Sequence, residues 1–267
     1  MDRRLNGRVT AASPAVGLGS LTVVGLGPGD PGLRLPAVSE ALAAATDIIG
    51  YRTYIDLAGP FDARQRVHAS DNRVELDRAR QAFELATAGA RVVVVSSGDP
   101  GVFAMATAVL EVLDHTEDPA WHRVQLSILP GVTAAQAAAA VAGAPLGHDF
   151  CALSLSDNLK PWAEIERRLA LVCEADLVLA FYNPRSKARP DQFGRAAALI
   201  RGLRPPETIV VLGRDMGRPG EQLTITTLAD LDPEQVDMRT VVVVGSSRTR
   251  RIERPNGGCW VYTPRSY

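Results

Sequence analysis

Residues 21–30, LTVVGLGPGD, determine how the rest of the chain is interpreted. A short apolar run ends there in Gly-Pro-Gly, which predicts a buried strand at residues 21–26 followed by a tight turn. Apolar residues then recur at helical spacing between residues 35 and 45, which predicts a helix. A strand, a glycine-rich turn and a helix in this order indicate one unit of an α/β fold.

The same order of strand, turn and helix recurs along the chain. Further strands are predicted at 47–50, 91–96, 124–129, 150–155, 176–181, 208–212, 222–227, 240–244 and 259–263, and helices at 74–88, 103–113, 134–144, 161–173 and 193–203. In the first half, alternating strands and helices predict a mostly parallel sheet that helices cover on both faces. We therefore predict two α/β domains, 21–130 and 131–267, with a ligand cleft between them and a flexible tail at residues 1–20.

The overall composition argues against several classes of protein. The 267 residues carry 29 basic and 30 acidic side chains, so their balance gives no general attraction to nucleic acid or to an anionic membrane. No apolar run reaches the roughly 18 residues of a membrane span. The three cysteines, Cys151, Cys173 and Cys259, are far apart, and the four histidines lack metal-binding spacing. We expect a cytoplasmic protein with reduced thiols and no metal site.

The first glycine-rich turn does not match the common phosphate-binding motifs. In GLGPGD, Asp30 stands where a dinucleotide-binding loop has its third glycine, and the next strand ends in Gly50-Tyr51-Arg52 without an acidic residue. A Walker loop would need a following Gly-Lys-Ser/Thr, which is missing. An oxidoreductase of the dinucleotide-binding type is therefore disfavoured. The turn is either purely structural or one whose backbone approaches a ligand closely.

The other turns each allow more than one interpretation. Asp99, in SSGDPG, either accepts a hydrogen bond from a ligand or caps the following helix. Thr133, in LPGVTA, is most simply a helix N-cap. The basic loop at residues 181–187, FYNPRSK, either recognises carboxylates or is merely exposed. No Gly-x-Ser-x-Gly elbow occurs, which disfavours a hydrolase.

Five turns considered together carry more information than any one of them. They are GLGPGDPG (25–32), SSGDPGVFAMA (96–106), LPGVTAA (129–135), FYNPRS (181–186) and VLGRDMGRPGE (211–221). In this order they resemble the tetrapyrrole methyltransferase family, also called class III methyltransferases. The resemblance extends from about Leu21 to the end of the chain. It implies two α/β domains, a homodimer, and S-adenosylmethionine bound in the cleft, with S-adenosylhomocysteine as the product.

Three further segments resemble one branch of that family, namely GYRTY (50–54), VGSSRTR (244–250) and WVYTPR (260–265). The resemblance implies methylation of precorrin-3B at C-17, with ring contraction to precorrin-4, in cobalamin biosynthesis. The alternative is a cobalt-precorrin-3B or another tetrapyrrole as substrate. A methyltransferase of the same fold acting on the diphthamide side chain or on ribosomal RNA is a further alternative, as is a tetrapyrrole- or nucleotide-binding module without catalysis.

The resemblance also implies which residues form the site. The cofactor-binding residues would be Pro28, Ser97, Gly98, Asp99, Val102, Thr133, Ala134, Tyr182, Asn183, Met216 and Gly245. The last of these belongs to a strand expected near the adenine. Ring contraction needs proton transfers, for which we name Asp71 or Tyr51 as the acid-base group. The carboxylates of the substrate need local cations, and the candidates are Arg52, Arg73, Arg185, Lys187 and Arg189.

Overall fold

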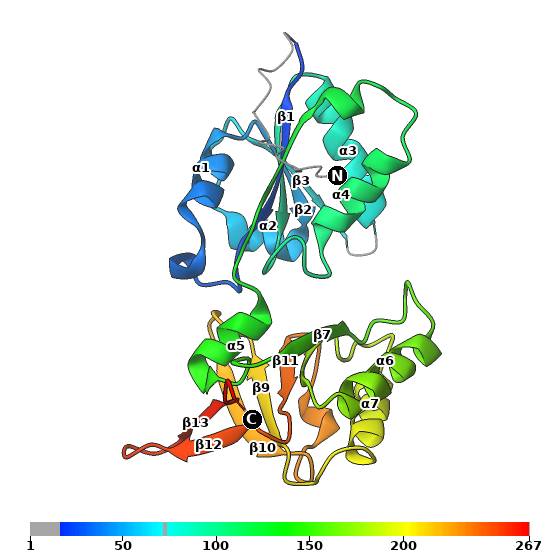
Figure 1. Ribbon diagram of the computed structural model, residues 1–267. Helices are drawn as coiled ribbons and strands as arrows, with labels where there is room; N and C mark the ends of the chain where they lie inside the picture. The colour runs from blue at the N-terminus through cyan, green and yellow to red at the C-terminus, as the bar shows by residue number, and fades with distance from the viewer. Residues whose placement is uncertain (1–16, 72–73, 267) are drawn as a thin grey trace, which may run out of the picture. The chain divides into compact units, whose positions relative to one another are not determined.

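The computed structural model describes residues 17–71 and 74–266, and Figure 1 shows the course of the chain. These residues divide into two units. Unit 1 contains residues 17–24, Pro36–Ser96 and Ala104–Leu129; unit 2 contains Gly25–Leu35, Ser97–Phe103 and the chain from Pro130 onward. The change from one unit to the other after Leu129 lies one residue from the predicted boundary. The two glycine-rich loops at 25–35 and 97–103 nevertheless group with unit 2, which the sequence did not indicate.

Unit 1 is built on a five-stranded sheet in the order β3-β2-β4-β1-β5. Its strands are β1 (Ser20–Gly25), β2 (Asp47–Tyr51), β3 (Arg66–Ser70), β4 (Arg91–Ser96) and β5 (Gln125–Leu129). The pairings of β2 with β3 and β4, and of β1 with β5, are parallel. The predicted tail reaches only partly into the described chain, where Ser20 already begins β1 and the Gly19 N–H donates to the Ala86 carbonyl.

Helices cover both faces of this sheet, with α1 on one face and α3 and α4 on the other (Figure 1). The helices are α1 (Pro36–Ala44), α2 (Arg52–Ala58), α3 (Glu75–Thr87) and α4 (Met105–Asp114), with a 3-10 turn at Trp121–Arg123. The buried faces of α3 and α4 meet strand residues such as Val23 and Ile49 around the fully buried Phe83. Burial of side chains of this size contributes about 1.5–3 kcal/mol each, so this core is the main stabilising element of unit 1.

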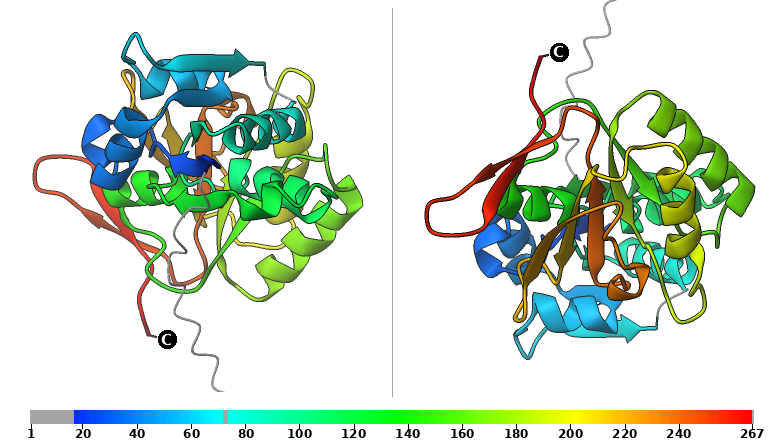
Figure 2. Two further views of the ribbon diagram at one scale, coloured as in Figure 1. Left: turned by 90° about the horizontal axis from the view of Figure 1, so that it is seen from above. Right: turned by 90° about the horizontal axis from the view of Figure 1, so that it is seen from below.

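Unit 2 contains a second five-stranded sheet in the order β10-β9-β11-β8-β7 and a small sheet in the order β12-β13-β6. The strands are β6 (Gly143–Ala144), β7 (Phe150–Ser154), β8 (Val178–Tyr182), β9 (Ile209–Arg214), β10 (Gln222–Thr227), β11 (Thr240–Val244), β12 (Arg250–Glu253) and β13 (Cys259–Tyr262). Figure 2 shows the hairpin of β12 and β13, in red, projecting away from the larger sheet.

The larger sheet of unit 2 is mixed. β7 pairs with β8 in parallel, but β11 is antiparallel to both β8 and β9, and β10 is antiparallel to β9. The sequence does not indicate these directions, because a fully buried strand such as TVVVV in β11 has the same apolar pattern in either direction.

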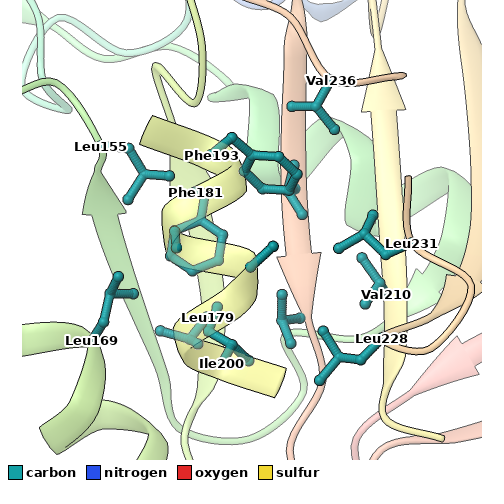
Figure 3. Close-up of a cluster of buried hydrophobic side chains, with 14 of the residues drawn as sticks. Leu155, Leu169, Leu179, Phe181, Phe193, Ile200, Val210, Leu228, Leu231 and Val236 are labelled. Carbon is teal, nitrogen blue, oxygen red and sulfur yellow. The ribbon is translucent and has the colours of Figure 1, made fainter. Parts of the chain in front are cut away.

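The larger sheet of unit 2 is covered by α6 (Trp162–Glu174) and α7 (Gln192–Arg201) on one face and by α5 (Ala134–Ala142) on the other (Figure 1). Figure 3 shows Phe193 and Ile200 of α7 directed at Phe181 and Leu179 of β8. Helix α5 approaches β9 closely at Gly213 and Ala138. Glycine is needed at this contact, because a Cβ on Gly213 would lie 2.6 Å from the Cβ of Ala138. In the described chain, no helix is both long and apolar enough to cross a bilayer.

Candidate cofactor and substrate site

Three glycine-rich turns meet within unit 2 around one carbonyl oxygen, that of Gly98. The N–H of Gly27 donates to this oxygen at 3.2 Å, and the N–H of Gly98 donates back to the Gly27 carbonyl at 2.7 Å. A Cβ added to Gly25 would lie 2.5 Å from the same oxygen, and one added to Gly131 only 2.2 Å from it. Glycine is therefore required in all three turns, because only a bare backbone fits this approach.

Asp99 links the second of these turns to the third. Its Oδ1 accepts from the Gly101 N–H at 2.8 Å, and its Oδ2 accepts from the Gly131 N–H at 3.0 Å. The helix α4 begins only at Met105, with Ala104 as its N-cap, so Asp99 does not cap it. Of the two interpretations of Asp99 from the sequence, the helix cap is wrong, and the carboxylate is engaged with backbone groups of the turns.

The side chain of Tyr182, the last residue of β8, joins that strand to the start of α5. Its Oη lies 2.8 Å from Oγ1 of Thr133 and accepts from the Ala135 N–H at 3.3 Å. Thr133 is also the N-cap residue of α5, as the sequence predicted. It therefore both caps the helix and contacts the Tyr182 hydroxyl. Burial raises the pKa of the Tyr182 phenol, and the negative charge of Asp99 raises it further. The hydrogen bonds with Thr133 and Ala135 lower the pKa, but by less. The phenol is therefore neutral at physiological pH.

The turn between β9 and β10 completes this part of unit 2. Met216 is buried against the α5 residues Ala135 and Ala138. Arg218 reaches back to the first two turns, where its Nε donates to the Pro28 carbonyl at 2.8 Å and its Nη2 to Oγ of Ser97 at 2.9 Å. The sequence indicated a functional turn here but did not identify Arg218, since nothing in a sequence shows which distant backbone atoms an arginine will meet.

Among the described residues, four other than glycine have a left-handed backbone conformation; three of them lie at the same turns, and the fourth, Asp176, lies before β8. Phe103, Asn183 and Asp215 have φ angles of 53°, 52° and 50°. Phe103 follows the predicted residue Val102, Asn183 is itself a predicted residue, and Asp215 precedes Met216. Such conformations cost about 1 kcal/mol or more each and persist where the surroundings fix them, which is most often at functional sites. This pattern, which is invisible in the sequence, points to the same turns as the motifs do.

All eleven predicted cofactor residues belong to unit 2, but one of them lies apart. The register of β11, which pairs Val242 with Phe181 and Val244 with Leu179, places Gly245 at the end of the sheet opposite Tyr182. There its carbonyl accepts from Nη1 of Arg204 at 2.5 Å. The prediction for Gly245 came from the family resemblance alone. Because β11 is antiparallel, Thr240 is its residue at the edge where β8 ends, and Gly245 is left out of the site proposed below.

The predicted substrate-binding cations differ in their environments. Arg185 forms an ion pair with Glu234 at 2.7 Å, and Lys187 is exposed. Arg189 is buried, and its Nη1 donates to the carbonyls of Leu155 and Asn183 at 3.3 and 3.2 Å. Since its guanidinium holds the backbone of its own loop, Arg189 is withdrawn from the substrate residues.

The remaining candidates lie in unit 1. Arg52 is exposed at the start of α2, and Arg73 lies outside the described residues. Tyr51 ends β2, and its register partner Ser70 ends β3, so Tyr51 and Asp71 share the carboxyl edge of this sheet. The backbone at Asp71 is held by a buried arginine, Arg78, whose Nη2 donates to the Asp71 carbonyl at 2.9 Å and whose Nε donates to Oγ of Ser70 at 3.1 Å. The residue Asp71 is exposed.

Comparison with known families identifies the class of protein. Residues 20–232 match the model of the Tetrapyrrole (Corrin/Porphyrin) Methylases. The chain belongs to this family, and the resemblance found in the five turns is confirmed.

Individual relatives are similar over most of the chain. It is 52% identical to the precorrin-3B C(17)-methyltransferase of Sinorhizobium sp, over 93% of this chain and 97% of that protein. It is 42% identical to the probable cobalt-factor III C(17)-methyltransferase of Salmonella typhimurium, over 86% of this chain and 93% of that protein. It is 49% identical to the cobalamin biosynthesis protein CobIJ of Mycobacterium tuberculosis, but spans only 48% of that longer relative.

Solved structures give the same result. The crystal structure of the methyltransferase CobJ has 51% sequence identity and a TM-score of 0.87, covering 92% of this chain and all of that one. The cobalt precorrin-4 methyltransferase CbiF, at 22% identity and a TM-score of 0.68 over 85% of this chain and 94% of that one, shares the fold. The prediction of two α/β domains of the tetrapyrrole methyltransferase type is therefore confirmed.

Proposed function

We propose that this protein methylates precorrin-3B at C-17, using S-adenosylmethionine, and contracts the ring to give precorrin-4 in cobalamin biosynthesis. The observation that carries the proposal is the 52% identity to a precorrin-3B C(17)-methyltransferase over nearly the whole length of both chains. The meeting of the glycine turns in unit 2 supports it, because segments far apart in the sequence form one arrangement of closely packed backbone.

The residues of unit 2 fit a sulfonium cofactor with an amino acid and a nucleoside part. The glycine turns allow close approach to their backbone, and the neutral Tyr182 adds a polar group without charge. The proposed residues are Pro28, Ser97, Gly98, Asp99, Val102, Thr133, Ala134, Tyr182, Asn183 and Met216. S-adenosylmethionine supplies an electrophilic methyl carbon, so the protein needs only to orient donor and acceptor and to exclude water.

Proton transfers during ring contraction require acid-base groups, for which we assign Tyr51 and Asp71. Tyr51 ends β2 and Asp71 follows β3 at one edge of the unit 1 sheet, and the contacts of Arg78 fix the backbone at Asp71. A side chain on a fixed backbone can hold or accept a proton at a defined position. For the carboxylates of the substrate we assign Arg52, Arg73, Arg185 and Lys187, since a guanidinium or ammonium group forms charge-assisted hydrogen bonds with them.

We further infer a homodimer acting in the cytoplasm. The support for the dimer is the family resemblance. The support for the cytoplasm is that Cys151, Cys173 and Cys259 are unpaired thiols, which persist in a reducing compartment. The 42% identity to a probable cobalt-factor III C(17)-methyltransferase favours a second candidate substrate, the corresponding cobalt-containing tetrapyrrole.

A turnover assay without oxygen and without cobalt tests the proposal. The purified protein is incubated with S-adenosylmethionine and precorrin-3B, and the mass and absorption spectrum of the product are followed. The expected result is a gain of one methyl group with a changed chromophore, together with formation of S-adenosylhomocysteine. Turnover with the cobalt-containing substrate alone would select the second candidate. Binding of S-adenosylhomocysteine without turnover of either substrate would contradict both.

A further inference from the structure

Arg218 occupies a distinctive place in unit 2, because one side chain contacts two loops that are far from it in the sequence. Its Nε donates to the Pro28 carbonyl at 2.8 Å, and its Nη2 donates to Oγ of Ser97 at 2.9 Å. The first loop follows β1 and the second follows β4, whereas Arg218 stands in the turn between β9 and β10. Both bonds are charge-assisted, which makes each roughly twice as strong as a neutral hydrogen bond.

Two glycines show that this contact is built into the shape of both turns. A Cβ on Gly29 would lie 2.5 Å from Cγ of Arg218, and a Cβ on Gly217 would lie 2.9 Å from Cγ of Pro28. Each turn therefore has a glycine where the neighbouring side chain of the other turn passes. Gly29 and Gly217 also have φ angles of 145° and 70°, a region that other residues rarely adopt.

The turn that carries Arg218 is held by its own hydrogen bonds. The Arg218 N–H donates to the Asp215 carbonyl at 2.8 Å, and the Arg218 carbonyl accepts from the Glu221 N–H at 3.0 Å. The Glu221 carboxylate accepts from the Gly217 N–H at 2.6 Å. The guanidinium thus extends from a fixed base, so its planar pair of donors can set the separation of the Pro28 and Ser97 loops.

We infer that Arg218 is a positioning residue that holds these two loops in the form that binds S-adenosylmethionine. This inference rests on the proposed function, in which Pro28 and Ser97 belong to the cofactor site. Arg218 acts through the loops, whose backbone it fixes before the cofactor arrives. Its removal should therefore weaken cofactor binding and raise the KM for S-adenosylmethionine, while kcat at saturating cofactor changes little.

The first test measures binding of S-adenosylhomocysteine by titration calorimetry in the wild type, R218Q and R218K. We expect R218Q to raise the Kd about tenfold, since two charge-assisted bonds are lost. The Kd of R218K should lie between those of the wild type and R218Q, because lysine keeps the charge but lacks the planar fork. The matched control is R251Q, which removes an exposed arginine paired with Glu253 on β12 and should leave the Kd unchanged. Thermal unfolding of each variant shows whether the fold is retained.

A double-mutant cycle separates positioning from general loss of structure. If Arg218 acts by holding Ser97, the effect of S97A on the Kd should be smaller in R218Q than in the wild type. G29A gives a second test that keeps the guanidinium, because the added Cβ would lie 2.5 Å from Cγ of Arg218, although alanine also strains the backbone there at φ of 145°. G29A should raise the Kd as R218Q does. If R218Q fails to fold, the binding test is made with G29A.

The outcomes distinguish this inference from the proposed function. If the wild type binds S-adenosylhomocysteine and both R218Q and G29A bind it equally tightly, the positioning role of Arg218 is wrong and the proposed function stands. Strictly additive effects of S97A and R218Q would also overturn the inference. If the wild type itself does not bind S-adenosylhomocysteine, the proposed function fails, and the inference fails with it.

Discussion

Phe103 combines two features that a structural side chain seldom has together. It adopts a left-handed backbone conformation with φ of 53°, and the residue is 48% exposed. Its ring stands 5.4 Å from that of Tyr182, whose hydroxyl is fixed by Thr133 and Ala135. A strained and exposed aromatic residue beside a fixed phenol contributes little to the core. We therefore assign its ring to contact with the cofactor or the substrate.

Replacing Phe103 with glycine and with alanine separates the ring from the backbone strain. F103G removes both, so we expect the free energy of unfolding to stay level or rise by up to about 1 kcal/mol while turnover falls. F103A removes the ring but keeps the strain, so its free energy of unfolding should stay close to that of the wild type while turnover falls. Denaturant unfolding and the methyl transfer assay measure the two effects. Normal turnover in F103G would show that the ring has no part in function.

At the scale of elements, the three glycine turns are the parts of the site that depend most on the absence of a side chain. In G131A, the added Cβ would lie 2.2 Å from the Gly98 carbonyl and would force the turns apart. We expect the Kd for S-adenosylhomocysteine to rise at least about tenfold, since steric displacement of a backbone group is not easily relaxed. Titration of the purified variant measures this change.

The matched control for that change is Gly194 in α7. A Cβ added there meets nothing within 4 Å, so the side chain has room. Since alanine is favoured over glycine inside a helix, G194A should raise the free energy of unfolding by roughly 0.5–1 kcal/mol and leave cofactor binding unchanged. Equal binding by G131A and G194A would show that the meeting of the turns is not needed for the cofactor.

The elements also show how far the sequence could predict the fold and the site. Strands such as β1, β4 and β8 were predictable because each is an apolar run ending in a small or polar turn. β3 was missed because RVHAS is a partly exposed edge strand without an apolar run, and α2 because it has only seven residues. The direction of β11, and with it the position of Gly245, depends on strand pairing between distant segments, which composition does not encode.

The site shows the same division between local and distant information. Glycines, Asp99 and Tyr182 were predictable because motifs in one segment mark them. The contacts of Arg218 were not, since its partners Pro28 and Ser97 are 190 and 121 positions away in the chain. Burial likewise misled the prediction for Arg189, because a basic loop residue looks exposed until the carbonyls of Leu155 and Asn183 are seen to surround its guanidinium.

At the scale of the whole molecule, the edge of the sheet in unit 1 depends on one buried carboxylate. The side chain of Asp47 is fully buried, and it accepts hydrogen bonds from Arg66 at 2.7 and 2.8 Å and from Thr46 at 2.9 Å. Nε2 of His68 lies 2.8 Å from it. Because Arg66 and His68 belong to β3, this cluster fastens the edge strand to β2.

The cluster makes the free energy of unfolding decrease at acidic pH. Burial acts to raise the pKa of Asp47, but the hydrogen bonds from Arg66, His68 and Thr46 outweigh it and lower the pKa from 3.8 to about 2. A carboxyl group with a lowered folded-state pKa adds stability above its unfolded pKa, and that stability is lost as the pH falls toward 2. We therefore expect the denaturant midpoint of unfolding to decrease between about pH 4 and pH 2.

D47N and D62N together test whether burial is what makes this aspartate important. D47N should lower the free energy of unfolding at pH 7 by about 1–3 kcal/mol, and its deficit should shrink as the pH approaches 2. Asp62 also pairs with an arginine, Arg64, at 2.9 Å and also has a pKa lowered to about 2, but both side chains are exposed. Exposed pairs are screened by water and salt, so D62N should change stability little at any pH. If D47N and D62N lost equal free energy of unfolding, the acid sensitivity would come from charge pairing alone. A loss confined to D47N places the acid sensitivity in the buried link between β2 and β3.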